Sequence, residues 1–166
     1  MTESPTSSAT VEFSGRTIDE VQSALAAVPA DMTRLLEGKT HDELMKPAND
    51  GGWGIVEIAP HFRDWEEVIT RRVDRILHEE RPALEEYDDS LWAIEHDYRS
   101  QDPLEAMDEF RKLRESLVAS VSALPESAWL RTATLPKRGG ITLHWLLNNV
   151  CDHDVKHLMQ SRDVLA

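Results

Sequence analysis

Cysteine is almost absent from this sequence of 166 residues, because Cys151 is the only one. A single cysteine excludes an internal disulfide bond and a zinc site built from several thiolates. Any metal ion would therefore have to be held by histidine, aspartate or glutamate side chains.

Basic residues are also scarce: 18 Lys and Arg stand against 31 Asp and Glu, which gives a formal net charge of −13. Such a charge opposes phosphate backbones, so we expect no nucleic-acid partner. No stretch approaches about eighteen consecutive apolar residues, and the start lacks the basic and apolar regions of a signal peptide. We therefore expect a cytoplasmic protein with no membrane partner.

Convincing strands and internal repeats are lacking too, whereas apolar residues recur in steps of three and four along much of the chain. This spacing is typical of amphipathic helices. The predicted helices cover residues 17–38, 55–78 and 102–124, and a last helix begins after Thr142. Capping signals precede the first, third and last of these helices.

Two prolines interrupt the helical pattern. We expect Pro29 to kink or split the first helix, because proline removes a backbone hydrogen bond and crowds the preceding turn. We expect Pro60 to distort the second helix locally, next to His61.

The connections between the helices complete the predicted fold. Residues 79–100 are too many for a tight turn and form a long crossover, whose acidic start, residues 79–89, is most simply a solvated loop. Four amphipathic helices with long crossover connections predict an all-α protein, a four-helix bundle. We expect residues 1–15 to form a loosely ordered leader and residues 16–166 to form a single domain.

His153 and His157 are the most informative feature of the chain. Because they are four residues apart, their side chains point from the same face of a helix, close enough to bind one cation. They also lie on the apolar stripe of the last helix, where a hydrogen-bonded pair of core histidines is the alternative. A catalytic zinc site usually needs a third protein ligand and leaves one position open.

His61 is the best third candidate, because it lies on the apolar side of a long helix. A buried histidine without a metal is the alternative here. The other histidines lie at element ends, in the crossover or on the opposite face of the last helix: His41, His78, His96 and His144.

Several segments together resemble the DinB-like superfamily between about residue 17 and residue 163. They are Trp53 to Glu66 with His61 inside, Asp-Pro-Leu-Glu-Ala at 102–106, Ile-Thr-Leu-His-Trp-Leu-Leu at 141–147 and His-Asp-Val-Lys-His at 153–157. The resemblance implies a four-helix bundle in which His61, His153 and His157 bind a divalent metal ion. Pro60 departs from the residue more usual in that family.

The resemblance also implies a range of activities, since the family includes thiol S-transferases that use bacillithiol, mycothiol or glutathione, and a mycothiol-dependent maleylpyruvate isomerase. It implies zinc or nickel, with iron or manganese as alternatives, and a homodimer. A small-molecule thiol would lose its proton at the metal and attack an electrophilic substrate. The alternatives to a thiol transferase are a hydrolase that activates water and a bundle with a purely structural metal.

Some neighbours of the histidines are candidates for lining the pocket or orienting an imidazole. Trp65 and Asn149 are each one turn from a histidine, and Asp64 and Asp154 are close enough in sequence to accept a hydrogen bond from an imidazole. For Trp65 the alternative is a core position, and for Asp154 it is a solvated helix face.

Overall fold

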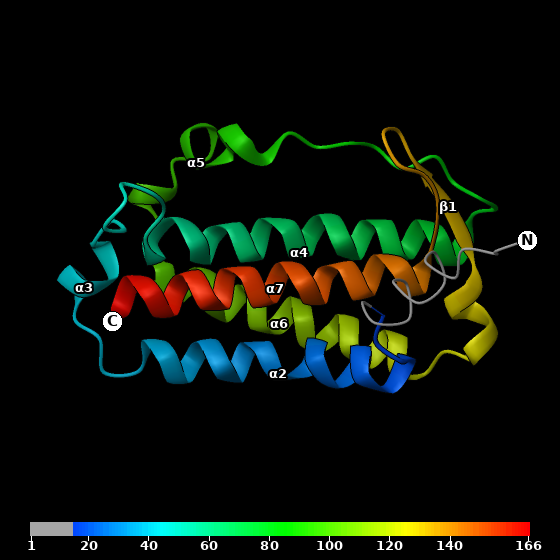
Figure 1. The fold of residues 1–166 in the computed structure, drawn as a ribbon, viewed down its shortest axis with the longest axis horizontal. Helices are drawn as coiled ribbons and strands as arrows, with labels where there is room; N and C mark the ends of the chain where they lie inside the picture. Colours follow the sequence, from blue (N-terminus) through cyan, green and yellow to red (C-terminus); the bar gives the residue numbers. More distant parts are fainter. Residues whose placement is uncertain (1–14) are drawn as a thin grey trace, which may run out of the picture.

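The computed structural model describes residues 15–166, and this part of the chain forms a bundle of four long helices (Figure 1). They are α2 (Ile18–Leu36), α4 (Ile55–His78), α6 (Pro103–Ser122) and α7 (Leu143–Leu165). Shorter elements connect them: α3 (His41–Met45), η1 (Asp89–Leu91), α5 (Trp92–Glu95), η2 (Tyr98–Ser100) and η3 (Glu126–Leu130). The predicted all-α four-helix bundle is confirmed.

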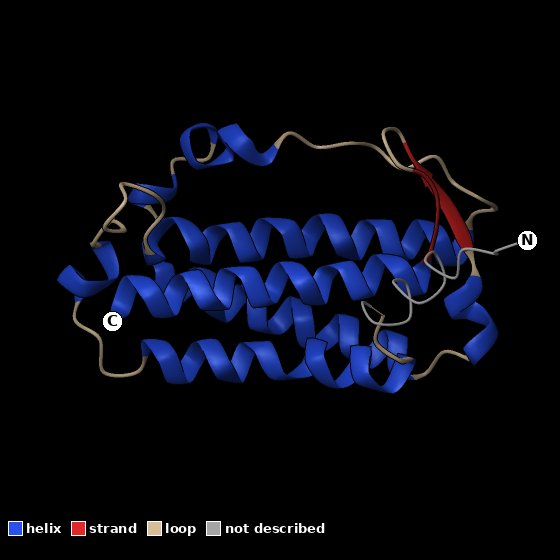
Figure 2. Cartoon of the chain, in the orientation of Figure 1, coloured by secondary structure: helices blue, strands red, loops and turns tan. Residues whose placement is uncertain are grey.

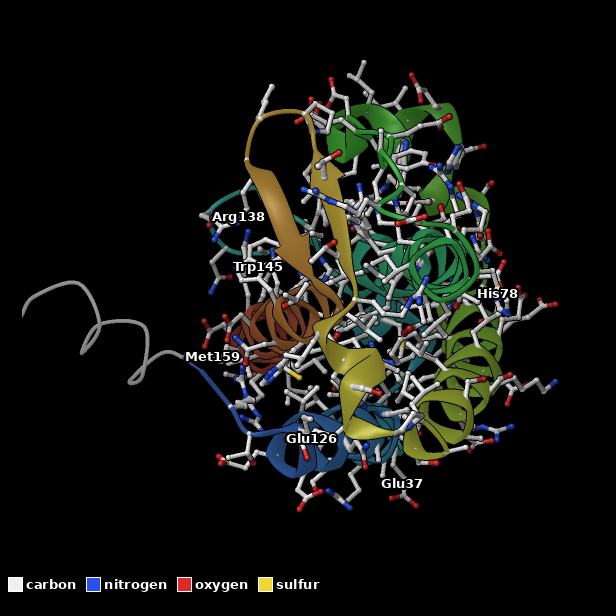
Figure 3. All side chains as sticks on the ribbon, turned by 90° about the vertical axis from the view of Figure 1, so that its right-hand side faces the viewer. Glu37, His78, Glu126, Arg138, Trp145 and Met159 are labelled. Carbon is white, nitrogen blue, oxygen red and sulfur yellow. The ribbon has the colours of Figure 1, made fainter. Side chains whose placement is uncertain are left out.

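The order of the helices around the bundle differs from their order in the chain. Both α2 and α4 pack against α6 and α7, so the helices follow one another as α2, α6, α4 and α7 when the bundle is seen end-on (Figure 3). Because α4 and α6 run in the same direction, the chain between them returns along the whole bundle, as Figure 1 shows. This return is the predicted long crossover.

The helix starts follow the capping rules. Thr17 and Glu20 form a reciprocal capping box at α2, and Asp102 accepts a hydrogen bond from the amide of Leu104 at α6. Both internal prolines lie within continuous helices, Pro29 in α2 and Pro60 in α4. Of the two alternatives expected for Pro29, a split of the first helix is wrong, and a kink stays a prediction.

A short hairpin precedes α7, and its two strands are red in Figure 2. The expectation that the chain has no strand is therefore wrong. It pairs β1 (Thr132–Leu135) with β2 (Gly139–Thr142) in antiparallel register. Four-residue strands are too short to show a clear alternation of apolar residues. The crossover adds to β1, because the amide of Leu84 donates to the carbonyl of Thr134 at 2.9 Å. Residues 79–89 are thus anchored at their centre and are not simply a solvated loop.

A buried ionic layer divides the apolar core into two clusters. One cluster lies toward the hairpin and the other toward α3. Between them, Glu66 of α4, Arg114 of α6 and Asp154 of α7 are each at most 2% exposed. Arg114 donates from Nε to Glu66 at 2.6 Å and from Nη1 to Asp154 at 2.8 Å. One guanidinium therefore ties three helices together across the bundle.

The remaining expectations concern the leader, the division into domains and the absence of membrane-spanning helices. The predicted leader, residues 1–15, lies outside the described residues except for Gly15. That residues 16–166 form a single domain stays a prediction. Within residues 15–166, no helix has the length and apolar character needed to cross a membrane.

Candidate metal centre

Three imidazoles from two helices meet at one point of the bundle. His61 projects from α4, and His153 and His157 project from α7. The Nε2 atom of His153 lies 3.1 Å from Nε2 of His61 and 3.1 Å from Nε2 of His157. The structure thus brings together all three histidines that the sequence predicted as a set. Their role as metal ligands stays a prediction.

The spacing of these nitrogen atoms suits a shared cation. Two imidazole nitrogens bound to one zinc ion at 2.0–2.1 Å in tetrahedral geometry are roughly 3.3 Å apart. The three donor atoms all lie within 4.8 Å of one another, so a divalent ion could be held among them. Within residues 15–166, no other His, Cys, Asp or Glu belongs to this group.

Burial keeps the three imidazoles in the neutral form that binds metals. Removal from water lowers the pKa of His61 to about 3, with a further contribution from His157. Burial and the two neighbouring histidines lower the pKa of His153 to about 3 as well. The pKa of His157 is also lowered by burial, which a hydrogen bond to Gln160 partly offsets. No proton therefore competes for the lone pairs near neutral pH.

Gln160 sets the tautomer of His157. The amide oxygen Oε1 of Gln160 lies 2.9 Å from Nδ1 of His157 and can only accept a hydrogen bond from it. Nδ1 then carries the proton and Nε2 presents its lone pair to the other two histidines. Gln160 lies on the apolar stripe of α7, and its spacing of three residues from His157 was the available signal for this role.

Trp53 covers the centre from the start of α4. Its ring contacts His61 edge-on, with centroids 4.8 Å apart, and stacks on His157 at 6.3 Å. The next residue must be glycine, because a Cβ atom on Gly54 would lie 2.1 Å from the carbonyl oxygen of Lys46. The helical pattern missed Trp53 because this residue precedes the helix.

The crossover supplies a carboxylate that the sequence pattern also missed. Oδ2 of Asp89 lies 3.9 Å from Nε2 of His61 and accepts a hydrogen bond of 2.7 Å from the indole of Trp65. Asp64 holds the same crossover against α4, because it accepts hydrogen bonds from Tyr98 at 2.7 Å and from His96 at 2.9 Å. Asp64 therefore binds crossover residues, and no ligand imidazole is among its hydrogen-bond partners.

A surface cleft of about 260 Å³ gives access to the three imidazoles. Its walls combine the aromatic ring before α4, the crossover carboxylate and a lysine of α7. The lining residues are Trp53, His61, Asp89, Ser90, His153, Lys156, His157 and Gln160. A small molecule in this cleft would lie against the imidazoles, with Asp89 and Lys156 as neighbouring charges.

Trp65 and Asn149 line a second cavity, which His153 also lines. That these two residues serve the metal centre stays a prediction. Ring centroids of Trp65 and His153 are 6.0 Å apart. Asn149 lies on the exposed side of this cavity, since its side chain is open to solvent.

Asp154 neither orients an imidazole nor lies on a solvated helix face, the two alternatives that the sequence offered. It is 1% exposed, so it does not lie on a solvated helix face, and its partner is Arg114. Burial raises the pKa of Asp154, against the opposing effect of Arg114. Burial likewise raises the pKa of Glu66 to about 7, which Arg114 opposes and Asp154 reinforces. A charged residue at a core position of a helical stripe was the signal for this ionic layer.

The second and last long helices of this four-helix bundle bring three neutral imidazoles together beside an open cleft. This arrangement defines a class of proteins suited to bind a divalent metal ion. The sequence model of the DinB superfamily matches residues 24–161, and the chain belongs to this superfamily. The resemblance seen in the sequence is thereby confirmed.

Relatives with curated names come from bacilli. YfiT of Bacillus subtilis (strain 168), named as a candidate metal-dependent hydrolase, is 28% identical over 107 residues, which are 64% of this chain and 60% of YfiT. A protein of Geobacillus thermodenitrificans (strain NG80-2) with the same description is 27% identical over 92 residues, or 55% of this chain and 52% of the relative. The matches thus span less than two thirds of these relatives' own length.

The fold also matches a solved structure. YfiT from Bacillus subtilis superimposes with a TM-score of 0.82 at 25% sequence identity, covering 98% of this chain and 91% of the YfiT chain. That protein is described as having an unusual four-helix bundle topology.

Proposed function

We propose that the protein is a metal-dependent enzyme in which His61, His153 and His157 bind one divalent ion and leave a position open to a small nucleophile. The observation that carries the proposal is the convergence of three neutral Nε2 atoms at the floor of a cleft. Structural zinc sites usually have four protein ligands, whereas catalytic sites have three. Zinc or nickel suits three imidazoles best, and iron or manganese also accept such donors.

The nucleophile that we propose is a low-molecular-weight thiol, which the enzyme transfers to an electrophilic small molecule. A divalent ion held by His61, His153 and His157 would lower the pKa of a coordinated thiol toward neutrality. The chain itself contributes Asp89, whose carboxylate borders the cleft and can accept the thiol proton. Trp53 shields the imidazoles from water on one side, and Lys156 offers a positive charge to an anionic group of the thiol or the electrophile.

A hydrolase is the second candidate, favoured by the names of the relatives in Bacillus and Geobacillus. In this case water takes the place of the thiol, and Asp89 accepts its proton. The two candidates differ in one requirement, since only the transferase needs an added thiol.

The first experiment measures metal content by mass spectrometry in protein purified without a histidine tag. We expect close to one zinc or nickel ion per chain, and less than about a tenth of an equivalent in His157→Ala. The matched control is His78→Ala, because His78 lies on the exposed end of α4. A wild-type chain that stays free of metal after loading with either ion would overturn the proposal.

The second experiment separates the two candidate reactions. A panel of small thiols is incubated with a chlorinated nitrobenzene and the metal-loaded enzyme. We expect thioether formation that depends on the thiol and is lost in His157→Ala. Turnover of ester or amide substrates without any thiol, together with no thioether, would favour the hydrolase instead.

Two further parts of the proposal concern the surroundings of the enzyme. We infer a homodimer, as the family resemblance implies, and sedimentation velocity of the full chain tests it. We also infer a cytoplasmic location, which agrees with the abundance of small thiols there and is tested by cell fractionation.

A further inference from the structure

The cavity that Trp65 and Asn149 line lies between α4 and α7 and has a volume of about 120 Å³. Its floor is Arg114 of α6, and β1 contributes Leu135 to its wall. His153 lines both this cavity and the cleft of the candidate metal centre. A molecule bound in the cavity would therefore lie next to an imidazole of that centre.

The walls of this cavity are mainly apolar and aromatic. They consist of Phe62, Trp65, Ile69, Leu135, Trp145, Leu146 and Val150. A cavity of about 150 Å³ with similar apolar walls accepts benzene in another protein. The size and the walls of this cavity therefore fit one six-membered ring.

Two buried polar atoms of residues that line the cavity lack a hydrogen-bond partner within residues 15–166: Oε1 of Glu66 and Nε of Arg72. The Glu66 oxygen is the acceptor of the two. Glu66 lines the cavity and is 2% exposed. Its Oε2 atom accepts a hydrogen bond from Arg114, but Oε1 has no hydrogen-bond partner among the described residues. A buried acceptor without a partner is costly, and a donor on a bound ligand would remove that cost.

The charges around the cavity cancel when both buried acids are ionised, which for Glu66 requires a pH above its pKa of about 7. Glu66 and Asp154 then contribute two carboxylates, while Arg72 and Arg114 contribute two guanidinium groups. The guanidinium of Arg72 is held at the rings of Trp65 and Tyr87, 5.6 Å from each centroid. A balanced lining of this kind favours a neutral ligand over an ammonium or a carboxylate.

We propose that this cavity is a binding site for a neutral aromatic group that carries a hydroxyl, and that the hydroxyl donates its hydrogen bond to Oε1 of Glu66. The ring lies between Trp65 of α4 and Leu146 and Val150 of α7. If the metal centre acts as proposed above, this ring is the unreactive part of the electrophilic substrate. That last step rests on the proposed function, whereas binding in the cavity does not.

The test compares phenol with toluene, which has nearly the same shape but cannot donate a hydrogen bond. Isothermal titration calorimetry is done on the full chain at a pH of about 8, above the pKa of about 7 of Glu66, once after treatment with a chelator and once loaded with zinc. We expect saturable binding of phenol in both samples, at least about tenfold tighter than binding of toluene. Equal affinities for the two compounds, or no saturable binding of phenol, would overturn the proposal whatever the metal content.

Two variants locate the hydrogen bond. Glu66→Met keeps the approximate length of the side chain but removes both oxygen atoms, and we expect it to abolish the preference for phenol. Glu67→Met makes the same change at the next residue of α4, which is exposed, and should leave the preference intact. A preference that persists in Glu66→Met contradicts the proposal.

A measurement on the unmodified chain covers the case in which Glu66→Met does not fold. Phenol ring protons should show nuclear Overhauser effects to the methyl groups of Ile69, Leu146 and Val150. Effects confined to methyl groups outside this cavity would overturn the proposal.

Discussion

Nδ1 of His157 donates a hydrogen bond of 2.9 Å to Oε1 of Gln160, three residues later on the same helix. Both groups belong to α7, so the orientation of this imidazole is set within one turn of one helix. His61 differs, because its Nδ1 is buried without a partner among the described residues. His157 is thus the imidazole whose tautomer the described contacts define.

Replacing Gln160 should therefore weaken metal binding through His157. We expect Gln160→Leu to lower the affinity for zinc by roughly 10- to 100-fold, because the Nδ1 proton loses its acceptor. Gln160→Glu should keep high affinity, since a carboxylate accepts the same hydrogen bond. Competition with a chromophoric chelator measures both affinities.

The control for this prediction is Gln22→Leu, the same substitution on α2, away from the centre. Its zinc affinity should equal that of the unmodified chain. Equal affinities of Gln160→Leu and Gln22→Leu would show that the hydrogen bond to His157 has no effect on the metal.

Arg114 should be among the most sensitive positions for stability. Arg114→Met leaves Glu66 and Asp154 buried without their cation, so we expect a loss of about 3–5 kcal/mol in the free energy of unfolding. Arg111→Met removes a guanidinium from the same helix, but its partners Asp108 and Glu115 are exposed. This control should lose less than about 1 kcal/mol. Urea denaturation measures both, and similar losses for the two variants would contradict the role of the ionic layer.

Gly54 should tolerate no side chain. A Cβ atom there would meet the carbonyl oxygen of Lys46 at 2.1 Å, so the backbone before α4 must shift and displace Trp53. We expect Gly54→Ala to destabilise the chain by roughly 1–3 kcal/mol and to weaken zinc binding. Gly140→Ala is the control, because no atom lies within 4 Å of a Cβ atom added there. Thermal unfolding with and without zinc checks both effects, and equal melting temperatures for the two variants would refute the prediction.

Sequence periodicity predicted the long helices and the convergence of the three histidines because both depend on which face of a helix each residue occupies. The predicted range of the second helix, residues 55–78, equals that of α4, whose apolar spacing is regular. His61 could be selected among the other histidines because it shares the apolar face. The side chains of His153 and His157 follow from a spacing of four residues on one helix.

The missed features depend on contacts between segments far apart in the sequence. Asp89 reaches His61 only because the crossover returns along the bundle, and no local pattern encodes that path. Asp154 seemed a solvated residue because its partner, Arg114, is 40 residues away on another helix. The β1–β2 hairpin is short and takes part of its support from Leu84 of the crossover. Tertiary partners of this kind are invisible to periodicity.

The metal-free chain should lose stability in acid because of its buried imidazoles. The pKa of His61 and that of His153 are each lowered from 6.5 to about 3 in the folded chain. Between these two values the unfolded chain binds protons that the folded chain does not. The stabilising effect of the neutral imidazoles is therefore complete above pH 6.5 and is lost progressively as the pH falls toward 3.

The ionic layer acts in the opposite direction over part of this range. The pKa of Glu66 is raised from 4.5 to about 7, so the folded chain binds this proton more readily and gains stability as the pH falls from 7 to 4.5. Three histidines have a lowered pKa, whereas two carboxyl groups, Glu66 and Asp154, have a raised one, which leaves a net loss of stability in acid. Glu66→Gln removes the contribution of Glu66 to the opposing effect, so the stability of this variant should fall more steeply than that of the unmodified chain below pH 6.5.

The change of the free energy of unfolding with pH can be measured by urea denaturation of chelator-treated protein at a series of pH values between 7 and 4.5. The double variant His61→Leu/His153→Leu removes both groups with a strongly lowered pKa, and its stability should rise or stay level as the pH falls. His78→Leu is the control, because His78 is exposed on the last turn of α4 and should leave the slope unchanged. A double variant as sensitive to acid as the His78→Leu control would show that the acid sensitivity arises outside the three-histidine centre.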